Sequence, residues 1–381
     1  MNHDVSILCL KLSSQDPDYL KHDGISIYRC DFSFSRWAPK IQKHKIEAAK
    51  KGFDKICQSF KPDVVWARSS AMGLGIIEAN HNNIPVIGIL PTIANMNCNG
   101  LYFNTKGNHP LKRSRLFIIG ILMYRLELEM ERKFLEHCIP VVFSNMMKLQ
   151  IKKCLGSLAE KVHVISPGVD SDFFSPSNGK YLKHKVTQNY GISPTPDEPW
   201  ILYVGRLSIA KNISILIDAL KYVRGNVRLV IVGDGKEKNS LINYAKKNNV
   251  YDRILFAGSQ YDLLPAFYTM SHVTVLPTVY ESFGQVFLES MACGTPVIGF
   301  SGNNNKILTA TEEIIINNET GIIVKKASSR ALANAINVLI NLSSTDYDQM
   351  SANAIRHVHN NFSWYQFVCS LLKLSTDNIS L

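Results

Sequence analysis

The sequence predicts an α/β protein with two domains, each built around a parallel β-sheet. The chain has 381 residues and 46% of them are hydrophobic, which is enough for two cores of ordinary size. Short apolar runs alternate with segments of helical spacing, as they do in βαβ units. This alternation stops at a polar segment rich in Pro and Gly, residues 175–199, and then starts again.

The first half is predicted to contain six strands and two clear helices. Apolar runs that are typical of strands occupy residues 4–12, 25–30, 62–67, 85–90, 140–144 and 161–166. Residues 41–60 space their apolar side chains as one face of a helix does, and residues 111–138 indicate a long helix with a basic start.

The second half repeats the pattern with six further strands. These are expected at residues 200–205, 227–233, 253–258, 272–277, 296–300 and 321–324, with helices near 212–222, 237–248, 284–293 and 328–341. Ligands of open parallel sheets bind beyond the carboxyl ends of the strands, where helices begin. Residues that directly follow these strands are therefore the candidates for a binding site.

Charge is unevenly distributed along the chain. The formal net charge is +11, and residues 1–180 carry 24 Lys and Arg against 16 Asp and Glu, a net of +8. This suits an anionic partner for the first half, either a membrane surface or a phosphorylated acceptor. The alternative is a merely basic soluble surface. Nucleic acid is disfavoured because no groove-reading motif accompanies the charge.

One basic segment is a candidate for contact with an anionic membrane surface. Lys112, Arg113 and Arg115 stand directly before the apolar run 116–124, which is too short to span a bilayer but could lie at its interface. The alternative is that this run is the buried face of a core helix. No secretion signal is visible at the N-terminus, and the eight cysteines form no CxxC motif, so we expect reduced thiols and a cytoplasmic protein.

The strand near residue 204 is followed by a candidate anion site. Gly205 ends the strand, Arg206 comes next, and Lys211 stands where a helix is expected to begin. Two cations beside a helix N-terminus suit a diphosphate. The alternative is a pair of solvated surface charges. The Gly-Asp-Gly sequence at 233–235 is expected to form only a tight turn, because a G-x-G-x-x-G motif is absent.

Two carboxylates, Glu281 and Glu289, bracket the start of the helix expected at 284–293. Eight residues of helix rise about 12 Å, which exceeds the separation of roughly 5–9.5 Å between the two carboxylates of a glycosidase. Hydroxyl groups are natural donors to carboxylates. The pair, next to a diphosphate site, therefore indicates an elongated ligand with hydroxyls on both sides of a diphosphate, which is a nucleotide sugar.

The second half contains four motifs in this order: "GRL…K", "VGDG", E-x7-E and "MACGTPVI". Together they resemble the donor domain of the GT-B fold, retaining glycosyltransferases of family 4. "VISPGVDSDFFSP" and "NFSW" extend the resemblance over nearly the whole chain. It implies two Rossmann-like domains that face each other across a cleft, with a C-terminal helix that crosses back to the first. The implied parts are an acceptor-side domain at 1–177, a linker at 178–199, a donor-binding domain at 200–360 and the returning helix at 361–381.

The resemblance also implies a role for each candidate residue. Gly205, Arg206 and Lys211 would bind the donor diphosphate, and the two cations would stabilise it as it leaves. Glu281 would hold the transferred sugar together with the backbone amides of Ser282, Phe283 and Gly284, and Glu289 would bond the ribose hydroxyls. The donor would be of the UDP or GDP type and the acceptor a glycan or lipid-linked precursor, as in polysaccharide or lipopolysaccharide biosynthesis at the inner face of the membrane.

No metal or other cofactor is expected, because the two cations would neutralise the leaving group. Three Asp-x-Asp pairs occur, at Asp16/Asp18, Asp170/Asp172 and Asp346/Asp348, but all lie away from the donor motifs and are interpreted as chance.

The chain departs from the family at its beginning. Its opening residues resemble the family's second strand, so the usual first strand, Gly-rich loop and first helix are expected to be missing. Arg68 stands where family members often carry a His. These departures leave open a truncated, inactive or regulatory relative that still binds nucleotide. A sugar-nucleotide epimerase is a third alternative, disfavoured because it needs proton-transfer groups in the cleft.

Overall fold

The structure is a computed structural model, which describes residues 3–11, 13, 15–31, 38–80, 82–93, 110–302 and 306–377. Within these ranges the side chains of residues 38–40 and 110–121 are not described. The chain folds into two compact units. The first contains Met1–Phe143, Met147–Ile165 and Cys369–Leu381, and the second contains Ser144–Met146 and Ser166–Val368.

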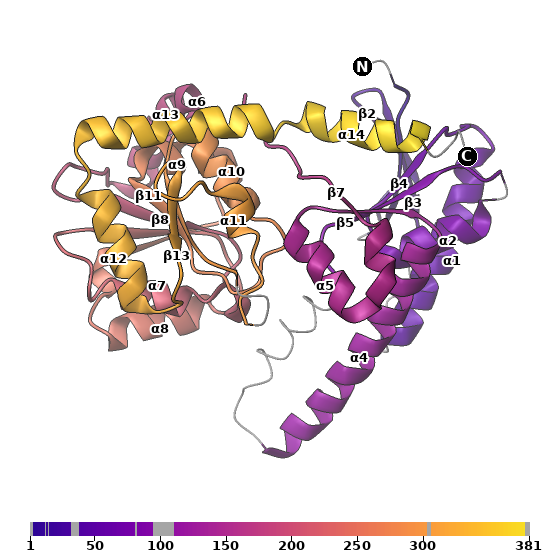
Figure 1. Ribbon diagram of the computed structural model, residues 1–381, viewed down its shortest axis with the longest axis horizontal. Coiled ribbons are helices and arrows are strands. Elements are labelled where there is room, and N and C mark those ends of the chain that lie inside the picture. Colours follow the sequence, from indigo (N-terminus) through magenta and orange to yellow (C-terminus); the bar gives the residue numbers. More distant parts are fainter. Residues whose placement is uncertain are drawn as a thin grey trace. The chain divides into compact units, whose positions relative to one another are not determined.

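The first unit contains two sheets (Figure 1). One has the strand order β1-β3-β2, and the other has the order β4-β5-β6-β7 with every neighbouring pair parallel. Val86–Leu90 is buried along its whole length, as expected for a central parallel strand. The strand bounds are β1 Ser6–Leu10, β2 Tyr19–His22, β3 Ile25–Cys30, β4 Val65–Ala67, β5 Val86–Leu90, β6 Ile139–Val142 and β7 His163–Val164.

Strand β2 is an element that the sequence did not reveal. It lies between two predicted strands, and it pairs antiparallel with β3. The turn between them is Asp23-Gly24, and both residues have positive φ, 49° and 82°. Asp-Gly is the preferred sequence for such a two-residue hairpin, because its left-handed backbone matches the twist of the strands. β1 then pairs with the other edge of β3, in parallel.

Among the described residues, the first unit contains the helices α1 Ala38–Cys57, α2 Ser70–Ala79, α4 Pro110–Glu136 and most of α5 Asn145–Leu155. The first two pack against each other, and Ala49, Phe53 and Ile56 are buried at helical spacing in α1. These are among the apolar positions from which the helix was predicted. Gly75 allows the close approach, because a Cβ there would overlap the Ile46 carbonyl oxygen.

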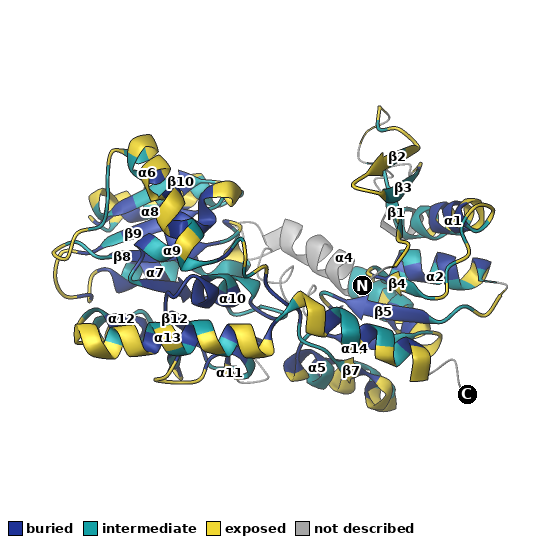
Figure 2. Ribbon diagram, turned by 90° about the horizontal axis from the view of Figure 1, so that it is seen from above, coloured by how far each residue is buried: buried dark blue, intermediate teal, exposed yellow. Residues whose placement is uncertain are grey.

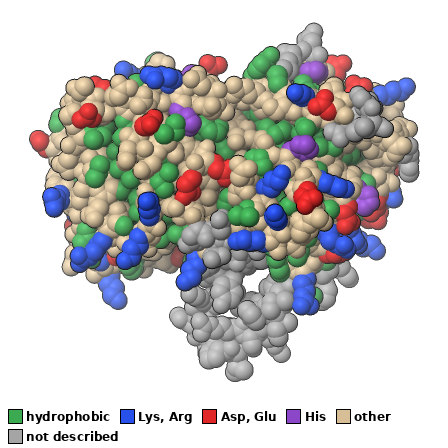
Figure 3. All heavy atoms as spheres, viewed as in Figure 1, with side chains coloured by type: hydrophobic (Ala, Val, Ile, Leu, Met, Phe, Trp, Pro, Cys, Tyr) green, Lys and Arg blue, Asp and Glu red, His purple; other side chains and the backbone are tan. Residues whose placement is uncertain are grey.

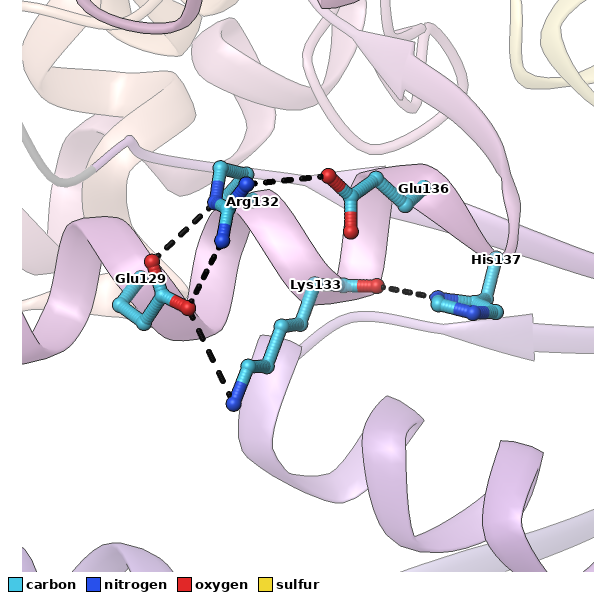
Figure 4. Close-up of polar contacts among 5 residues, drawn as sticks. All are labelled: Glu129, Arg132, Lys133, Glu136 and His137. Atoms are coloured by element: carbon cyan, nitrogen blue, oxygen red, sulfur yellow. Dashed lines mark hydrogen bonds and ion pairs between the residues drawn. The ribbon is translucent and has the colours of Figure 1, made fainter.

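The last turns of α4 show how this helix is held. Phe134 and Leu135 are buried, while the outward face carries Arg132, which donates hydrogen bonds to Glu129 at 3.0 and 3.1 Å (Figure 4). Exposed pairs of this kind contribute only about 0.3–0.5 kcal/mol each, so the buried face determines the stability of the helix. Lys112, Arg113 and Arg115, the basic cluster, fall within the range of α4, but the structure does not describe their side chains. In the described part of the chain, no helix combines the length and the apolarity needed to cross a membrane.

Basic and acidic side chains are interspersed on the visible face of the first unit (Figure 3). Elsewhere in the first unit, Lys11 forms ion pairs with both Asp18 and Asp31.

The second unit is built on one six-stranded parallel sheet with the order β10-β9-β8-β11-β12-β13. Its central strands are continuous apolar runs buried on both faces by helices (Figure 2). All six strands predicted from the second half are present: β8 Trp200–Val204, β9 Arg228–Val232, β10 Ile254–Gly258, β11 Val273–Leu276, β12 Val297–Phe300 and β13 Gly321–Val324.

The helices of the second unit include several that the sequence did not reveal. Their bounds are α6 Pro176–Tyr190, α7 Ile213–Ala219, α8 Lys238–Lys247, α9 Leu264–Met270, α10 Gln285–Ala292, α11 Thr311–Ile314, α12 Ser329–Ile340, α13 Ser344–Asn361 and α14 Trp364–Asp377. The final residues of α14, from Cys369 on, group with the first unit. Together with residues 163–165 they line a cavity of about 310 Å³.

The expectation of a linker at 178–199 is wrong for residues 178–190, which belong to helix α6 in the second unit. Ser175 caps the helix by accepting from the Asn178 N–H, Pro176 occupies the first turn, and Gly191 ends it with φ 66°. Leu182 and Val186 are buried against the unit. The Ser-Pro and Gly residues that suggested a linker are thus the start and stop signals of a helix.

Gly179 of α6 provides a test of this packing. A Cβ at this position would overlap Thr269 Oγ1 and the Pro265 carbonyl oxygen of α9. Gly179→Ala should therefore destabilise the protein by about 1–3 kcal/mol from overpacking, although Ala is favoured over Gly in helices by about 1 kcal/mol. Lys180→Ala, at the exposed neighbouring position, is the control. Chemical denaturation measures both, and a stabilised Gly179→Ala variant would contradict the packing of α6 on α9.

Candidate functional site

The strand order of the second unit identifies where a ligand can bind. Chain order runs outward in one direction from β8 through β9 to β10, and in the other direction from β11 through β12 to β13. The order therefore reverses between β8 and β11, which are neighbours in the sheet. In open α/β sheets the crevice beyond the carboxyl ends of such a pair is the ligand site. The candidate residues Lys211 and Glu281 follow these two strands.

The loop after β8 has an unusual backbone that the neighbouring loop holds in place. Gly205 has φ 146° and donates its N–H to the Val232 carbonyl oxygen, while Leu207 donates to the Asp234 carbonyl oxygen. Tyr203 is buried at the end of β8, and its hydroxyl donates to the Arg206 carbonyl oxygen at 3.2 Å. Burial raises the pKa of Tyr203, so the hydroxyl keeps its proton.

The Gly-Asp-Gly sequence supports the β8 loop from the other side. Gly233 and Gly235 have φ 143° and 158°. A Cβ at Gly233 would overlap the Gly205 carbonyl oxygen, and one at Gly235 would overlap the Leu207 carbonyl oxygen. The expected tight turn is confirmed, and its function is to bring two loop backbones into direct contact.

Lys211 and Glu281 are brought together by the fold although 70 residues separate them. The Lys211 ammonium donates to Glu281 Oε2 at 2.6 Å, and the two side chains are 24% and 22% exposed. Lys211 lies in the short 3₁₀ turn Ile209–Lys211, which ends at Asn212 with φ 52°. The ion pair is thus partly shielded but open to a ligand.

Arg206 is exposed, and its side chain has no hydrogen bond or ion pair with any residue that the structure describes. It follows Gly205 directly, on the same loop as Lys211. A long cationic side chain of this kind is available to an anion that reaches the loop.

The loop after β11 positions Glu281 and leads into α10. The Glu281 N–H donates to the Leu308 carbonyl oxygen at 2.9 Å, which anchors the residue beside the sheet. Phe283 is buried, and Gly284 adopts φ 109° immediately before the helix. In the described chain, the N–H groups of Ser282, Phe283 and Gly284 have no acceptor. They are the donors that a helix N-terminus offers to a bound oxygen atom.

Glu289, one turn into α10, accepts a hydrogen bond from a buried tyrosine. The Tyr268 hydroxyl donates to Glu289 Oε2 at 2.7 Å. Burial raises the pKa of Glu289, and the hydrogen bond from Tyr268 partly offsets that rise. Between Glu281 and Glu289, only the residues from Gln285 on are helical. The rise of eight helical residues therefore does not describe the separation of the two carboxylates.

The Asp-x-Asp pairs are engaged locally, as far as the described residues show. Asp18 is paired with Lys11, Asp170 accepts from the N–H groups of Asp172 and Phe173, and Asp346 accepts from the Ser343 hydroxyl. Within the described ranges, no group of three or more His, Cys, Asp or Glu residues is placed to hold a metal ion. Arg68, at the end of β4, belongs to the first unit.

Sequence comparisons relate the second half of the chain to glycosyltransferases. Residues 190–357 match the family model described as glycosyl transferases group 1. An uncharacterized glycosyltransferase of Methanocaldococcus jannaschii is 31% identical over 60% of this chain and 57% of its own length. A D-inositol 3-phosphate glycosyltransferase of Xylanimonas cellulosilytica is 27% identical over 49% of this chain and 44% of its own length. The chain thus spans about half the length of the curated relatives it matches.

Solved structures extend the likeness to the fold of the whole chain. Sucrose-phosphate synthase of Thermosynechococcus elongatus has a TM-score of 0.79 at 20% identity and covers 99% of this chain and 89% of its own. HepE of Anabaena, in complex with UDP-glucose, has a TM-score of 0.68 at 18% identity and covers 98% of this chain and 99% of its own. These structures show that the fold is the GT-B fold, and residues 190–357 are similar to the glycosyl transferases of group 1.

The buried carboxylate provides a test that separates function from stability. Because its folded pKa is raised, Glu289 favours folding most at low pH, and this contribution is lost as the pH rises through the folded pKa. Glu289→Gln keeps an oxygen for the Tyr268 hydroxyl and removes the buried charge. At pH 7 the variant should have an unchanged or higher free energy of unfolding, with a flatter pH dependence. Glu319→Gln, on the surface, is the control, and a clear loss of stability in Glu289→Gln alone would contradict this.

Proposed function

We propose that the protein is a retaining glycosyltransferase that moves a sugar from a nucleotide sugar to an acceptor. The observation that carries the proposal is the meeting of Lys211 and Glu281 at the point where the strand order reverses. A cation and a hydroxyl acceptor side by side suit the bond between a diphosphate and a sugar. Arg206 and the unoccupied amides before α10 add further donors at the same edge of the sheet.

The proposed donor is a nucleoside diphosphate sugar of the UDP or GDP type. HepE is described in complexes with UDP and with UDP-glucose, which supports a donor of this class. In the proposal Gly205, Arg206 and Lys211 bind the diphosphate. The carboxylate of Glu281 and the N–H groups of Ser282, Phe283 and Gly284 hold the transferred sugar, while Glu289 accepts hydrogen bonds from the ribose.

In the proposed chemistry, the bond between the anomeric carbon and the diphosphate breaks. An acceptor hydroxyl forms the new bond on the same face of the sugar and loses its proton to the departing phosphate. Negative charge grows on the phosphate oxygen as the bond breaks. Arg206 and Lys211 are fixed donors that stabilise this charge without rearrangement during the reaction. The positive N-terminal end of the α10 dipole also helps to neutralise the growing phosphate charge.

The proposed acceptor is a lipid-linked or cell-surface glycan precursor. This rests on the net charge of +8 on residues 1–180 and on the basic cluster of α4, which suit reversible contact with an anionic membrane surface. The protein would then work in the cytoplasm, at the inner face of the membrane.

A second candidate is a relative that binds nucleotide without transferring a sugar. It is favoured by Arg68, which stands where a His was expected after β4. A sugar-nucleotide epimerase is disfavoured by the E-x7-E and "GRL…K" pattern, because an epimerase needs proton-transfer groups in its cleft. Nucleotide release from a panel of UDP and GDP sugars, with and without acceptor lipids, separates the three.

Loss of either cation should remove most activity. Arg206→Ala and Lys211→Ala each eliminate a donor to the leaving group, at about 2–4 kcal/mol of transition-state stabilisation, or roughly 100- to 1000-fold in rate. Lys185→Ala on the exposed face of α6 is the matched loss of a cation and should retain the parental rate. Thermal melts check that each variant folds. Turnover at the parental rate in both site variants would disprove the assignment.

Activity should survive chelation, because two side-chain cations take the place of a metal at the diphosphate. Initial rates are measured after dialysis against EDTA and again after addition of Mg²⁺ or Mn²⁺. An enzyme that is silent after dialysis and restored by either ion would show that the leaving group needs a metal.

A further inference from the structure

Tyr268 is a buried polar residue that the sequence did not single out. It lies on α9 with its side chain fully enclosed, and its ring packs edge-on against Phe174 at 6.0 Å between centroids. Its backbone is also held, since the carbonyl oxygen accepts from the Thr295 hydroxyl at 2.7 Å. The one polar atom of the side chain is directed at Glu289 Oε2, at 2.7 Å. Tyr268 therefore has little freedom to move, and the carboxylate it contacts shares that restriction.

The hydrogen bond fixes how Glu289 can receive a ligand. A carboxylate at the end of a three-bond side chain otherwise rotates, and its last torsion is broad. With Oε2 accepting from Tyr268, the plane of the carboxylate is set and Oε1 remains for another donor. A fixed acceptor suits a ligand hydroxyl in one defined place.

The same contact controls the charge of the carboxylate. Burial disfavours the anion and raises the pKa of Glu289, and the Tyr268 hydroxyl opposes this by donating to the charged form. In the part of the chain that the structure describes, the other titratable group that interacts with Glu289 is the thiol of Cys293, the residue that caps the end of α10. Burial and Glu289 raise the pKa of both Tyr268 and Cys293, so both are neutral at pH 7. Among the described residues, no Lys, Arg or His shifts the pKa of Glu289.

We propose that Tyr268 is a positioning residue, which holds the Glu289 carboxylate so that it accepts hydrogen bonds from the ribose hydroxyls of the donor. The proposal rests on the proposed function, because it takes Glu289 as the ribose acceptor. It adds that recognition of the ribose depends on a residue that does not touch the donor. Removal of the hydroxyl frees the carboxylate and also makes it easier to protonate.

The test uses the full chain and measures binding of UDP, GDP and their 2′-deoxy forms by calorimetry from pH 5.5 to 8.5. Tyr268→Phe is compared with Tyr347→Phe, which also removes a tyrosine hydroxyl from the second unit, where it donates to the His272 carbonyl oxygen at 3.0 Å. Glu289→Gln is measured in parallel. Thermal melts of the two Tyr variants report the structural cost of losing a hydroxyl in each.

For the nucleotide that the parental protein binds, Tyr268→Phe should weaken affinity about tenfold at pH 6.5, which corresponds to one hydrogen bond to a charged group. The loss should shrink at pH 8.5, where the carboxylate ionises more readily. Discrimination between the ribose and 2′-deoxyribose forms should fall as well. Tyr347→Phe should change none of these.

Equal effects in the two Tyr variants, or an unchanged pH profile and unchanged 2′-deoxy discrimination in Tyr268→Phe, would overturn the proposal while leaving the proposed function intact. Parental affinity in Glu289→Gln would instead remove Glu289 from the ribose site, and with it the role of Tyr268. Failure of the parental protein to bind either nucleotide would contradict the proposed function itself.

Discussion

The reversal of strand order between β8 and β11 is the constraint on which the site depends. Parallel strands end at one edge of the sheet, and at a reversal the two following connections run to opposite sides and leave a crevice. The loops that carry Lys211 and Glu281 are those two connections, so the ion pair at 2.6 Å is a direct consequence of topology. Gly205 and Gly284 supply the positive φ that each loop needs before its helix begins.

Close contacts with neighbouring segments hold the loops at this edge of the sheet in place. The Gly-Asp-Gly turn after β9 contacts the β8 loop backbone to backbone, and the buried Tyr203 hydroxyl binds the Arg206 carbonyl oxygen. On the other side Gln285 donates to the Gly168 carbonyl oxygen at 2.6 Å, which ties the start of α10 to a neighbouring segment. The charged side chains are thus carried by backbone that is held on both sides.

The second unit could be predicted well because its strands are continuous apolar runs with polar residues directly after them. The sequence did not reveal one turn, one helix start and the contacts between residues that are far apart in the chain. Asp23-Gly24 makes a hairpin, and Ser175 with Pro176 starts a helix, yet both look like loop composition in isolation. Tyr268 lies in a short helix, Leu264–Met270, that is buried on nearly every side and so has no helical period to detect. Its partner Glu289 is 21 residues away, and only the fold makes them neighbours.

The contact of the Gly233–Gly235 turn with the β8 loop also bears on how the protein can adapt to different ligands. No side chains lie between these two backbones that could change conformation to make room. Neither loop can therefore shift without displacing the other. In the proposed site, adjustment to a larger or smaller anion is then left to side chains that reach outward, above all the long and exposed Arg206. Relatives that bind different ligands should accordingly differ in the side chains of these loops, while the path of the loop backbone stays the same.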